Sequence, residues 1–407
     1  MAAMLMSAAA LSRVSPAGPS SSSSTSSSSR VAISGARVPV RTTQRRSIQT
    51  QVRATVSKDN VFAGSPSTVP GLSLGASGTP MNWNPEESVT VPHRERLKVF
   101  SGSAHPELSN EIANYLGMEL GKVVIKKFAD GEVYVQIQES IRGCDVFLVQ
   151  PTCPPCNDNL MELLIMIDAC RRASCRSITC VMPYYGYARA DRRTAGRESI
   201  AAKLTANLLT EAGATRIVML DIHSLQTIGY FDIPVDHIYG ETVIMDYLTS
   251  KDFSPKDLVV VSPDVGGVAR ARAFAKKLCD APMAIIDKRR TGHNKAEVMN
   301  LIGEVNGKVA IMLDDMIDTG GTLLAGAKLL KAQGAKEIYA CATHAVFSPP
   351  AAENLGSGVF TEVIVTNSMP HTPERDFPQL TVLSVGNLLG ETIWRVHNDT
   401  PVSFNKL

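Results

Sequence analysis

The sequence lacks an apolar run long enough to cross a bilayer, a second paired-cysteine motif and, in residues 1–58, any acidic side chain. A spanning helix needs about 20 consecutive apolar residues, so we expect no membrane-spanning helix. Cys153 and Cys156 form a lone CxxC motif, which without a second pair or suitably spaced histidines argues against a zinc site. These cysteines are either ordinary loop thiols or a redox-sensitive pair, because a helix predicted to begin near Asp158 would lower the pKa of Cys156.

The acid-free segment 1–58 carries eight basic residues and the serine-rich run SSSSSTSSSS at positions 20–29. A segment that is poor in acids, contains arginine and is rich in serine is typical of an organelle transit peptide. The serine excess favours the chloroplast stroma over the mitochondrion. A plain disordered tail is the alternative, and residues 59–95, rich in Gly, Pro, Ser and Thr, are predicted to be a disordered linker.

The near-neutral charge of the whole chain hides a mildly acidic remainder. Without the eight basic residues of segment 1–58, the chain has 33 of its 41 Lys and Arg against 39 Asp and Glu, a formal charge of −6. A surface of this sign does not favour wrapping a nucleic acid. Local basic groups are therefore expected to bind something smaller.

From residue 98 onward, short apolar segments alternate with helical patterns. Alternation of this kind, with runs of Val, Ile and Leu, indicates an α/β fold with a mainly parallel sheet covered by helices on both faces. The expected strands are 123–126, 133–138, 146–150, 178–183, 217–220, 258–262, 283–286, 309–313, 338–343 and 362–366. The expected helices are 160–172, 200–211, 268–278 and 323–333.

An internal repeat suggests two similar domains. ANLLTEAGATRIVMLDIH at 206–223 matches AKLLKAQGAKEIYACATH at 327–344 with a constant offset of 121, so that His223 corresponds to His344. Each copy is a helix, a glycine and a strand, an arrangement that is also common in unrelated α/β proteins. The resulting division places a first domain at 96–241, a second at 242–398, and a tail at 399–407 that can return to the first domain.

The segment DDMIDTGGT follows the expected strand 309–313 and precedes the helix 323–333. Ligands bind at the carboxyl ends of parallel strands, and backbone N–H groups at a helix N-terminus attract anions. Thr319, Gly320, Gly321 and Thr322 would thus hold a phosphate, while Asp314 and Asp315 accept hydrogen bonds from vicinal hydroxyls. The pattern predicts a site for a ribose 5-phosphate. Helix capping by Asp318 or Thr319 alone would not explain the acidic pair.

Several further segments make the chain similar to the ribose-phosphate pyrophosphokinase family, in its plant plastid, phosphate-dependent form. The segments that carry the resemblance are FADGE at 128–132, SIRGCDVFLVQ at 140–150, NDNLMELLIMIDACRRAS at 157–174, PYYGYARADRR at 183–193, DIHSLQTIGYFDIPVD at 221–236, VSPDVGG at 261–267, IIDKRR at 285–290 and DDMIDTGGT itself. The resemblance covers about residue 98 to the end. It implies two phosphoribosyltransferase-type domains.

The implied reaction transfers the β,γ-diphosphoryl group of ATP to the C1 hydroxyl of ribose 5-phosphate. It gives 5-phosphoribosyl 1-diphosphate and AMP, for nucleotide, histidine and tryptophan biosynthesis. The family also implies Mg²⁺ as cofactor, inorganic phosphate as activator, and a homo-oligomer expected to be a hexamer built of dimers. No nucleic acid or membrane partner is expected.

Site roles follow from the resemblance, position by position. Lys288 and Arg189 would stabilise the transition state, with His223 as a third catalytic residue. ATP would contact Phe128, Asp130, Glu132, Arg189 and Asp191, the aromatic side chain stacking on adenine across a subunit contact. Ribose 5-phosphate would contact Arg290, Asp314, Asp315, Asp318, Thr319, Gly320, Gly321 and Thr322. The implied metal ligands are Asp221, His223, Asp232, Asp236 and Asp264.

One departure and two rival functions accompany this assignment. Ala190 stands where the family often has glutamine, which removes a contact to the nucleotide. A further segment places four arginines among small residues: Arg189, Arg192, Arg193 and Arg197. This composition fits a mobile loop that closes over polyphosphate, and the alternative is a plain solvated surface loop. A phosphoribosyltransferase would share DDMIDTGGT but has no reason to carry the other segments. A non-enzymatic regulatory subunit should have lost Lys288, Arg189 and His223, which are all present.

Overall fold

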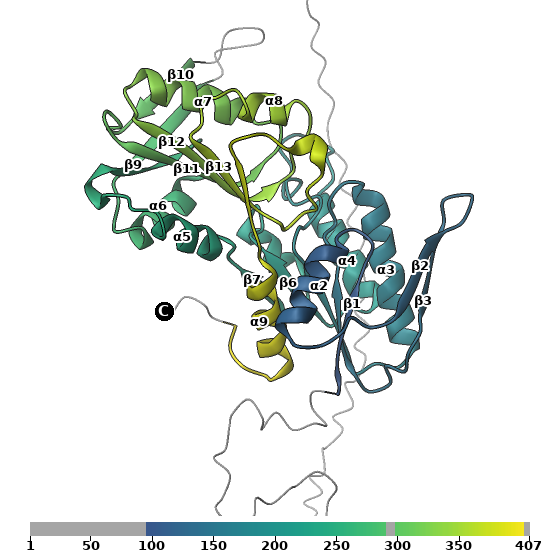
Figure 1. The fold of residues 1–407 in the computed structure, drawn as a ribbon. Helices are drawn as coiled ribbons and strands as arrows, with labels where there is room; N and C mark the ends of the chain where they lie inside the picture. Colours follow the sequence, from purple (N-terminus) through teal and green to yellow (C-terminus); the bar gives the residue numbers. More distant parts are fainter. Residues whose placement is uncertain (1–94, 290–297, 403–407) are drawn as a thin grey trace, which may run out of the picture. The chain divides into compact units, whose positions relative to one another are not determined.

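The computed structural model describes residues 95–289 and 298–402. Two separate mainly parallel sheets form its two halves, and helices pack on both (Figure 1). Within the described ranges, no helix combines the length and the apolar character that crossing a bilayer requires.

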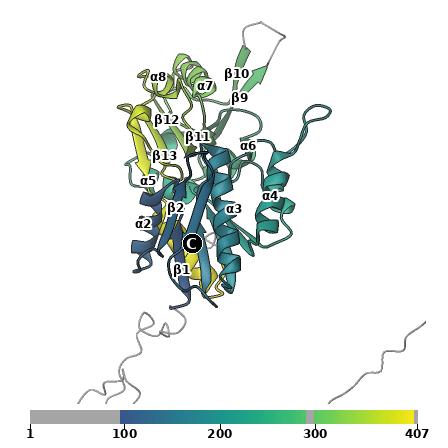
Figure 2. The same cartoon turned by 90° about the vertical axis from the view of Figure 1, so that its right-hand side faces the viewer.

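The sheet of the first half has five strands, all parallel, in the order β1-β4-β5-β6-β7. The strands are β1 (Leu97–Ser101), β4 (Asp145–Val149), β5 (Ser177–Met182), β6 (Arg216–Leu220) and β7 (Val235–Ile238). The helices are α2 (Pro106–Tyr115), α3 (Cys156–Arg172) and α4 (Ala201–Ala212), with a 3-10 turn η1 (Leu225–Tyr230). An antiparallel hairpin of β2 (Val123–Lys127) and β3 (Val133–Ile137) lies beside α3 (Figure 2) and extends away from this sheet (Figure 1).

Alternate residues of the first sheet face two different apolar layers. In β4, Val146 and Leu148 pack with α3 and α4, whereas Phe147 and Val149 pack with α2 and α9 (Gly386–His397). Both faces of the sheet are therefore buried, which explains why its strands read as continuous apolar runs rather than as alternating ones.

The sheet of the second half has seven strands in the order β10-β9-β8-β11-β12-β13-β14, with only the β9–β10 pair antiparallel. The strands are β8 (Leu258–Ser262), β9 (Met283–Arg289), β10 (Val298–Ile302), β11 (Val309–Ile317), β12 (Glu337–Ala345), β13 (Glu362–Thr366) and β14 (Leu380–Leu383). The helices are α5 (Glu241–Thr249), α6 (Val268–Lys277), α7 (Gly321–Ala332) and α8 (Ala351–Leu355), with 3-10 turns η2 (Pro255–Asp257) and η3 (Pro373–Arg375).

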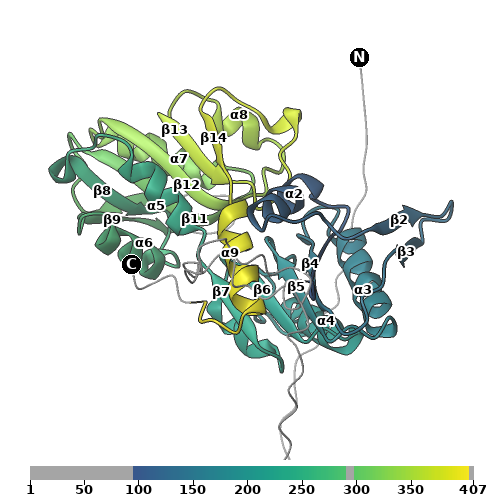
Figure 3. The same ribbon diagram turned by 60° about the horizontal axis from the view of Figure 1, so that its bottom comes forward.

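The last helix, α9, returns to the first half. It lies beside α2 (Figure 3), and the Tyr115 hydroxyl donates a hydrogen bond of 2.8 Å to Glu391. Leu389 and Ile393 of α9 are buried with Leu108 and Ile112 of α2. The end of the chain thus contributes to the core of the first half, although the domain boundaries at 241 and 398 stay predictions.

The predicted fold class is confirmed: both sheets are mainly parallel and flanked by helices. All ten predicted strands and all four predicted helices occur, with ends displaced by a few residues. One displacement matters for function. The predicted strand 309–313 continues as β11 to Ile317, because Asp314 and Met316 still pair with Ala342 and His344 of β12. The acidic pair therefore lies in the strand rather than in the loop after it.

Candidate active site

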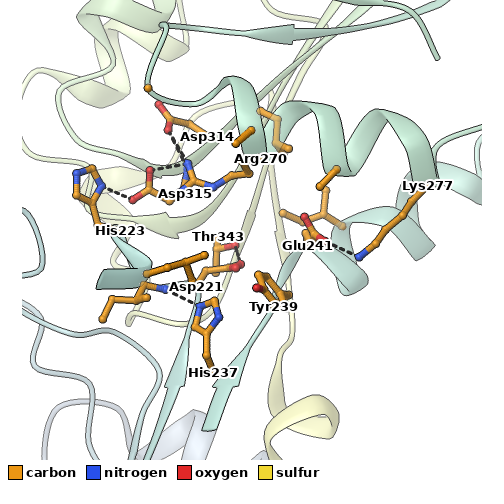
Figure 4. Close-up of a pocket in the computed structure, with 17 residues that line it drawn as sticks. Asp221, His223, His237, Tyr239, Glu241, Arg270, Lys277, Asp314, Asp315 and Thr343 are labelled. Carbon is orange, nitrogen blue, oxygen red and sulfur yellow. Dashed lines mark hydrogen bonds and ion pairs between the residues drawn. The ribbon is translucent and has the colours of Figure 1, made fainter. Parts of the chain in front are cut away.

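A cavity of about 400 Å³ lies where the end of β6 meets the ends of β11 and β12. Side chains from both halves line it (Figure 4). Those that carry polar groups are Asp221, His223, His237, Tyr239, Glu241, Arg270, Lys277, Asp314, Asp315 and Thr343. The apolar part of the lining includes Ile222, Ile244, Ala273 and Leu313. Four of the predicted site residues, Asp221, His223, Asp314 and Asp315, are thus brought together here.

His223 and Asp315 join the two halves directly. His223 follows β6, and its Nδ1 lies 2.7 Å from Oδ2 of Asp315 on β11. The Asp315 side chain is only 3% exposed, whereas that of His223 is 39% exposed. The hydrogen bond to Asp315 raises the pKa of His223, which favours the imidazolium form facing this carboxylate.

Arg270 completes this cluster, and the sequence did not reveal it. It lies on α6, and its Nη1 is 3.0 Å from Oδ1 of Asp315 and 3.4 Å from Oδ1 of Asp314. Burial alone would raise the pKa of Asp315, but the hydrogen bond from His223 and the charge of Arg270 lower it. Burial and the neighbouring charge of Asp315 instead raise the pKa of Asp314. The two adjacent carboxylates are therefore not equivalent.

The Asp221 carboxylate contacts the N-cap residue of α5 and a side chain of β12. Its Oδ2 accepts a hydrogen bond of 2.8 Å from Gly240 N–H and another from the Thr343 hydroxyl. His344 Nε2 lies 3.0 Å from the carbonyl oxygen of Asp221. Burial raises the pKa of Asp221 to about 6. These contacts tie the end of β6 to β12 and to the start of α5.

The phosphate-type loop lies between β11 and α7. Gly320 has φ of 70° at the N-cap of α7, a left-handed conformation that favours glycine, and α7 begins at Gly321. A side-chain carbon added at Gly321 would meet nothing closer than the Thr319 hydroxyl at 3.9 Å, so its backbone is open to a ligand. Arg189, from the loop after β5, forms an ion pair of 2.6 Å with Asp318. The loop of the second half thus contacts the predicted polyphosphate loop of the first.

The remaining predicted metal ligands are spread out. Asp232 is exposed. Asp236 pairs at 2.6 Å with Arg216, the first residue of β6, whereas Asp221 follows its last. Asp264 accepts a hydrogen bond of 2.8 Å from Gly267 at the start of α6. Among residues 95–289 and 298–402, no three His, Cys, Asp or Glu side chains converge on a metal position. The ligand set stays a prediction.

The predicted adenine contacts lie on the hairpin β2–β3. Phe128 is 49% exposed and contacts Tyr134 of the same hairpin edge-on, with ring centroids 5.9 Å apart. Asp130 and Glu132 are also exposed at this turn. None of the three lines the cavity described above. Asp191, by contrast, is buried beside Tyr230, whose hydroxyl donates to the Asp191 carbonyl oxygen.

The remaining predictions concern Lys288, Arg290, Thr322 and the cysteines of the CxxC motif. The backbone of Lys288 in β9 pairs with that of Met299 in β10, but the Lys288 side chain and all of Arg290 lie outside what the structure describes. Thr322, on the first turn of α7, is exposed. Cys156 is the first residue of α3, and burial raises its pKa, so the expected lowering by the helix N-terminus is wrong. Burial likewise raises the pKa of Cys153 to about 11.

Comparisons with known proteins agree with the resemblance drawn from the motifs. Residues 97–213 match a family model described as the N-terminal domain of ribose phosphate pyrophosphokinase, and residues 288–405 match the phosphoribosyl synthetase-associated domain. Ribose-phosphate pyrophosphokinase 1, chloroplastic, from Oryza sativa subsp. japonica is 72% identical over 312 residues, 77% of this chain and 79% of that protein. Ribose-phosphate pyrophosphokinase 1 from Spinacia oleracea is 72% identical over 308 residues, 76% of this chain and 92% of that protein.

A solved structure extends this similarity to three dimensions. Phosphoribosylpyrophosphate synthetase from Mycobacterium smegmatis superposes with a TM-score of 0.71 at 44% sequence identity. The match covers 74% of this chain and 99% of that one. Both halves of the described structure are therefore shared with that protein.

Proposed function

The chain belongs to the ribose-phosphate pyrophosphokinase family, and from that premise we propose which of its residues carry the reaction. The enzyme transfers the β,γ-diphosphoryl group of ATP to ribose 5-phosphate, and it acts in the chloroplast, as the names of its relatives and the composition of residues 1–58 indicate. The observation that carries the residue assignment is the contact of His223 with Asp315, because it brings an end of each sheet into one site.

Ribose 5-phosphate binds at the end of β11. The backbone of residues 319–322 receives the 5-phosphate at the N-terminus of α7, where backbone N–H groups and the helix dipole favour an anion. Asp314 accepts hydrogen bonds from the vicinal hydroxyls, with Asp315 beside it and Asp318 at the turn. Support comes from the open backbone at Gly321 and from the exposure of the Asp314 side chain, which is 31% accessible.

The C1 hydroxyl oxygen attacks the β-phosphorus of ATP, and the bond from that phosphorus to the bridging α,β-oxygen breaks. AMP leaves with this oxygen, and the hydroxyl proton is released to water. Negative charge builds up on the bridging and equatorial oxygens, so fixed cations are the means of catalysis. We assign this role to Arg189, Lys288 and the imidazolium of His223. Arg189 is held near the sugar-phosphate loop by its ion pair with Asp318.

ATP binding needs a second copy of the chain. Phe128, Asp130 and Glu132 lie on the exposed hairpin β2–β3, apart from the cavity that holds His223. The hairpin would place them against the nucleotide of a neighbouring subunit, which makes the active enzyme a homo-oligomer. An exposed aromatic side chain beside two exposed carboxylates is what stacking on adenine and hydrogen bonding to it require.

Mg²⁺ is the expected cofactor. It takes oxygen ligands and usually combines one or two carboxylates with substrate phosphates and water, so a preformed protein cage is not needed. The exposed carboxylates of Asp232 and Asp264 suit this role better than Asp221, whose Oδ2 is engaged by Gly240 and Thr343. Bound with ATP, the ion would neutralise charge on the transferred group.

Phosphorus NMR of the chain without residues 1–58 tests this assignment. With ribose 5-phosphate, Mg²⁺ and ATP, we expect the signals of a sugar diphosphate and of AMP to appear together, faster with inorganic phosphate. Formation of ADP would contradict transfer from the β-phosphorus. Absence of transfer with substrate binding intact would contradict the function itself.

A further inference from the structure

Arg270 lies at the centre of the charged cluster without belonging to the predicted site. It is on the first turn of α6, and Ala269, Arg270, Ala273 and Lys277 of this helix face the cavity (Figure 4). The alanines leave the cavity open, while the Arg270 side chain extends toward β11 and retains 27% exposure. It therefore reaches the acidic pair from the side opposite to His223.

The two oxygens of Asp315 are both engaged by cations. Arg270 Nη1 is 3.0 Å from Oδ1, and His223 Nδ1 is 2.7 Å from Oδ2. The side chain is 3% exposed, so neither oxygen is readily available to a sugar hydroxyl. Asp314 is 31% exposed and makes a longer contact of 3.4 Å with the same Nη1. The pair thus divides into an inner carboxylate that binds cations and an outer one that faces the cavity.

The end of β11 places both carboxylates beside α6. Along the first part of the strand, side chains alternate: Ile311 and Leu313 pack in the apolar layer that includes Ala271 and Phe274 of α6, whereas Ala310 and Met312 pack in the layer of α7. The alternation does not continue through the acidic pair, because Asp314 and Asp315 both line the cavity and both contact Arg270, and Ile317 packs in the layer of α7. An uncompensated carboxylate at the inner position would be costly.

We propose that Arg270 is a positioning residue for ribose 5-phosphate, acting through Asp315 and Asp314 to orient the outer carboxylate toward the sugar hydroxyls. This inference rests on the proposed function of the site. Arg270 also offsets the charge of two adjacent carboxylates that would otherwise repel an anionic sugar phosphate. Its one nitrogen spans both carboxylates, and the planar guanidinium holds this geometry better than the flexible ammonium of lysine.

The test compares Arg270→Gln and Arg270→Lys with Arg272→Gln, an exposed arginine on the same helix, in the full chain. Misplaced binding groups can lower rates by about 100-fold, so we expect Arg270→Gln to lower kcat/KM for ribose 5-phosphate by about 10- to 100-fold. KM for ATP should change less than about 3-fold, and lysine should restore part of the loss because it keeps the charge. Arg272→Gln should stay within about 2-fold of the unaltered chain.

The sugar hydroxyls provide a readout that a merely structural role would not move. Arg270→Gln should reduce the preference for ribose 5-phosphate over 2-deoxyribose 5-phosphate by at least about 5-fold, because the displaced carboxylate no longer recognises the hydroxyl. An unchanged preference, or an equal loss for both sugars and for ATP, would overturn the proposal.

Two controls distinguish an error in this inference from a folding defect of the variant and from an error in the proposed function. The double variant Arg270→Gln, Asp315→Asn removes both charges, so its melting temperature should be near that of the unaltered chain. Its preference for ribose 5-phosphate over 2-deoxyribose 5-phosphate should stay reduced. Recovery of this preference would overturn the proposal. If the unaltered chain makes no sugar diphosphate, the proposed function fails. The role of Arg270 is then tested by calorimetry of ribose 5-phosphate binding alone. Weaker binding to the Arg270→Gln variant but not to the Arg272→Gln variant supports the proposal, and equal binding to both refutes it.

Discussion

Replacing Asp221 by asparagine should stabilise the folded chain at alkaline pH. This side chain accepts hydrogen bonds from Gly240 N–H at 2.8 Å and from the Thr343 hydroxyl, and both end on the same oxygen, Oδ2. An amide oxygen in that position can accept both. The substitution therefore removes a buried charge and keeps the contacts that join the two halves.

The size of the effect follows from the pKa of Asp221. Burial raises it to about 6 from the ordinary 3.8. Because the folded chain binds this proton more tightly than the unfolded chain, the associated stability is complete below pH 3.8 and is lost as pH rises through 6. At about 1.4 kcal/mol per pKa unit, the loss reaches about 3 kcal/mol at most, and about half of it falls between pH 5 and pH 8.

Urea unfolding at pH 5 and pH 8, without Mg²⁺, tests this reasoning. Asp221→Asn should be more stable than the unaltered chain at pH 8, by about 1–3 kcal/mol, with an advantage that shrinks toward pH 5. Asp221→Ala is the matched control, since it leaves Gly240 N–H and the Thr343 hydroxyl without their acceptor and should destabilise at both pH values. An asparagine variant that is less stable at pH 8, or whose advantage does not depend on pH, would refute the argument.

Three other substitutions should separate stability, turnover and nucleotide binding. Burial would raise the pKa of Asp145, but hydrogen bonds from Arg176 and Ser177 lower it. The stability that the ionised Asp145 contributes is therefore present above its ordinary pKa and is lost as pH falls. In urea unfolding, Asp145→Asn should lower the free energy of unfolding by about 1–3 kcal/mol at pH 7, and by less toward pH 4. Lys288→Ala should lower turnover at least ~10²-fold with an unchanged melting curve; near-normal turnover would remove it from catalysis. Phe128→Ala should raise KM for ATP at least ~5-fold but not KM for ribose 5-phosphate, and an equal rise in both would contradict stacking.

The fold could be predicted where the chemistry is local. Strands buried on both faces read as apolar runs, as in β8, whose five residues are all buried. The strand β7, with the sequence VDHI, was missed because it pairs only with β6 at the edge of its sheet and carries polar side chains. The packing of α9 on α2 could not be foreseen either, since it joins segments more than 250 residues apart and leaves no local pattern.

The site residues could likewise be predicted only where the sequence carries a local signal. The strand end and the glycine turn pointed to Asp314 and Asp315, because ligands bind where parallel strands end, and the family resemblance pointed to His223. Arg270 has no such signal: it is one of two arginines on a helix of ordinary composition, and only the packing of α6 beside β11 shows which of them meets a carboxylate. The helix that follows SPDVGG offered one indication, because its first turn must lie close to the strand ends of the same sheet.

The internal repeat acquires a physical meaning at this junction. Gly213 and Gly334 end the corresponding helices α4 and α7 with positive φ, and the corresponding strands β6 and β12 lead to His223 and His344. The two strand ends meet, since Thr343 and His344 contact Asp221. Burial lowers the pKa of His344, which remains neutral and holds the junction between Asp221 and Ser368, whereas the hydrogen bond to Asp315 raises that of His223. Two histidines at equivalent positions thus serve opposite needs: one joins the halves, and the other can carry positive charge in the cavity that the junction creates.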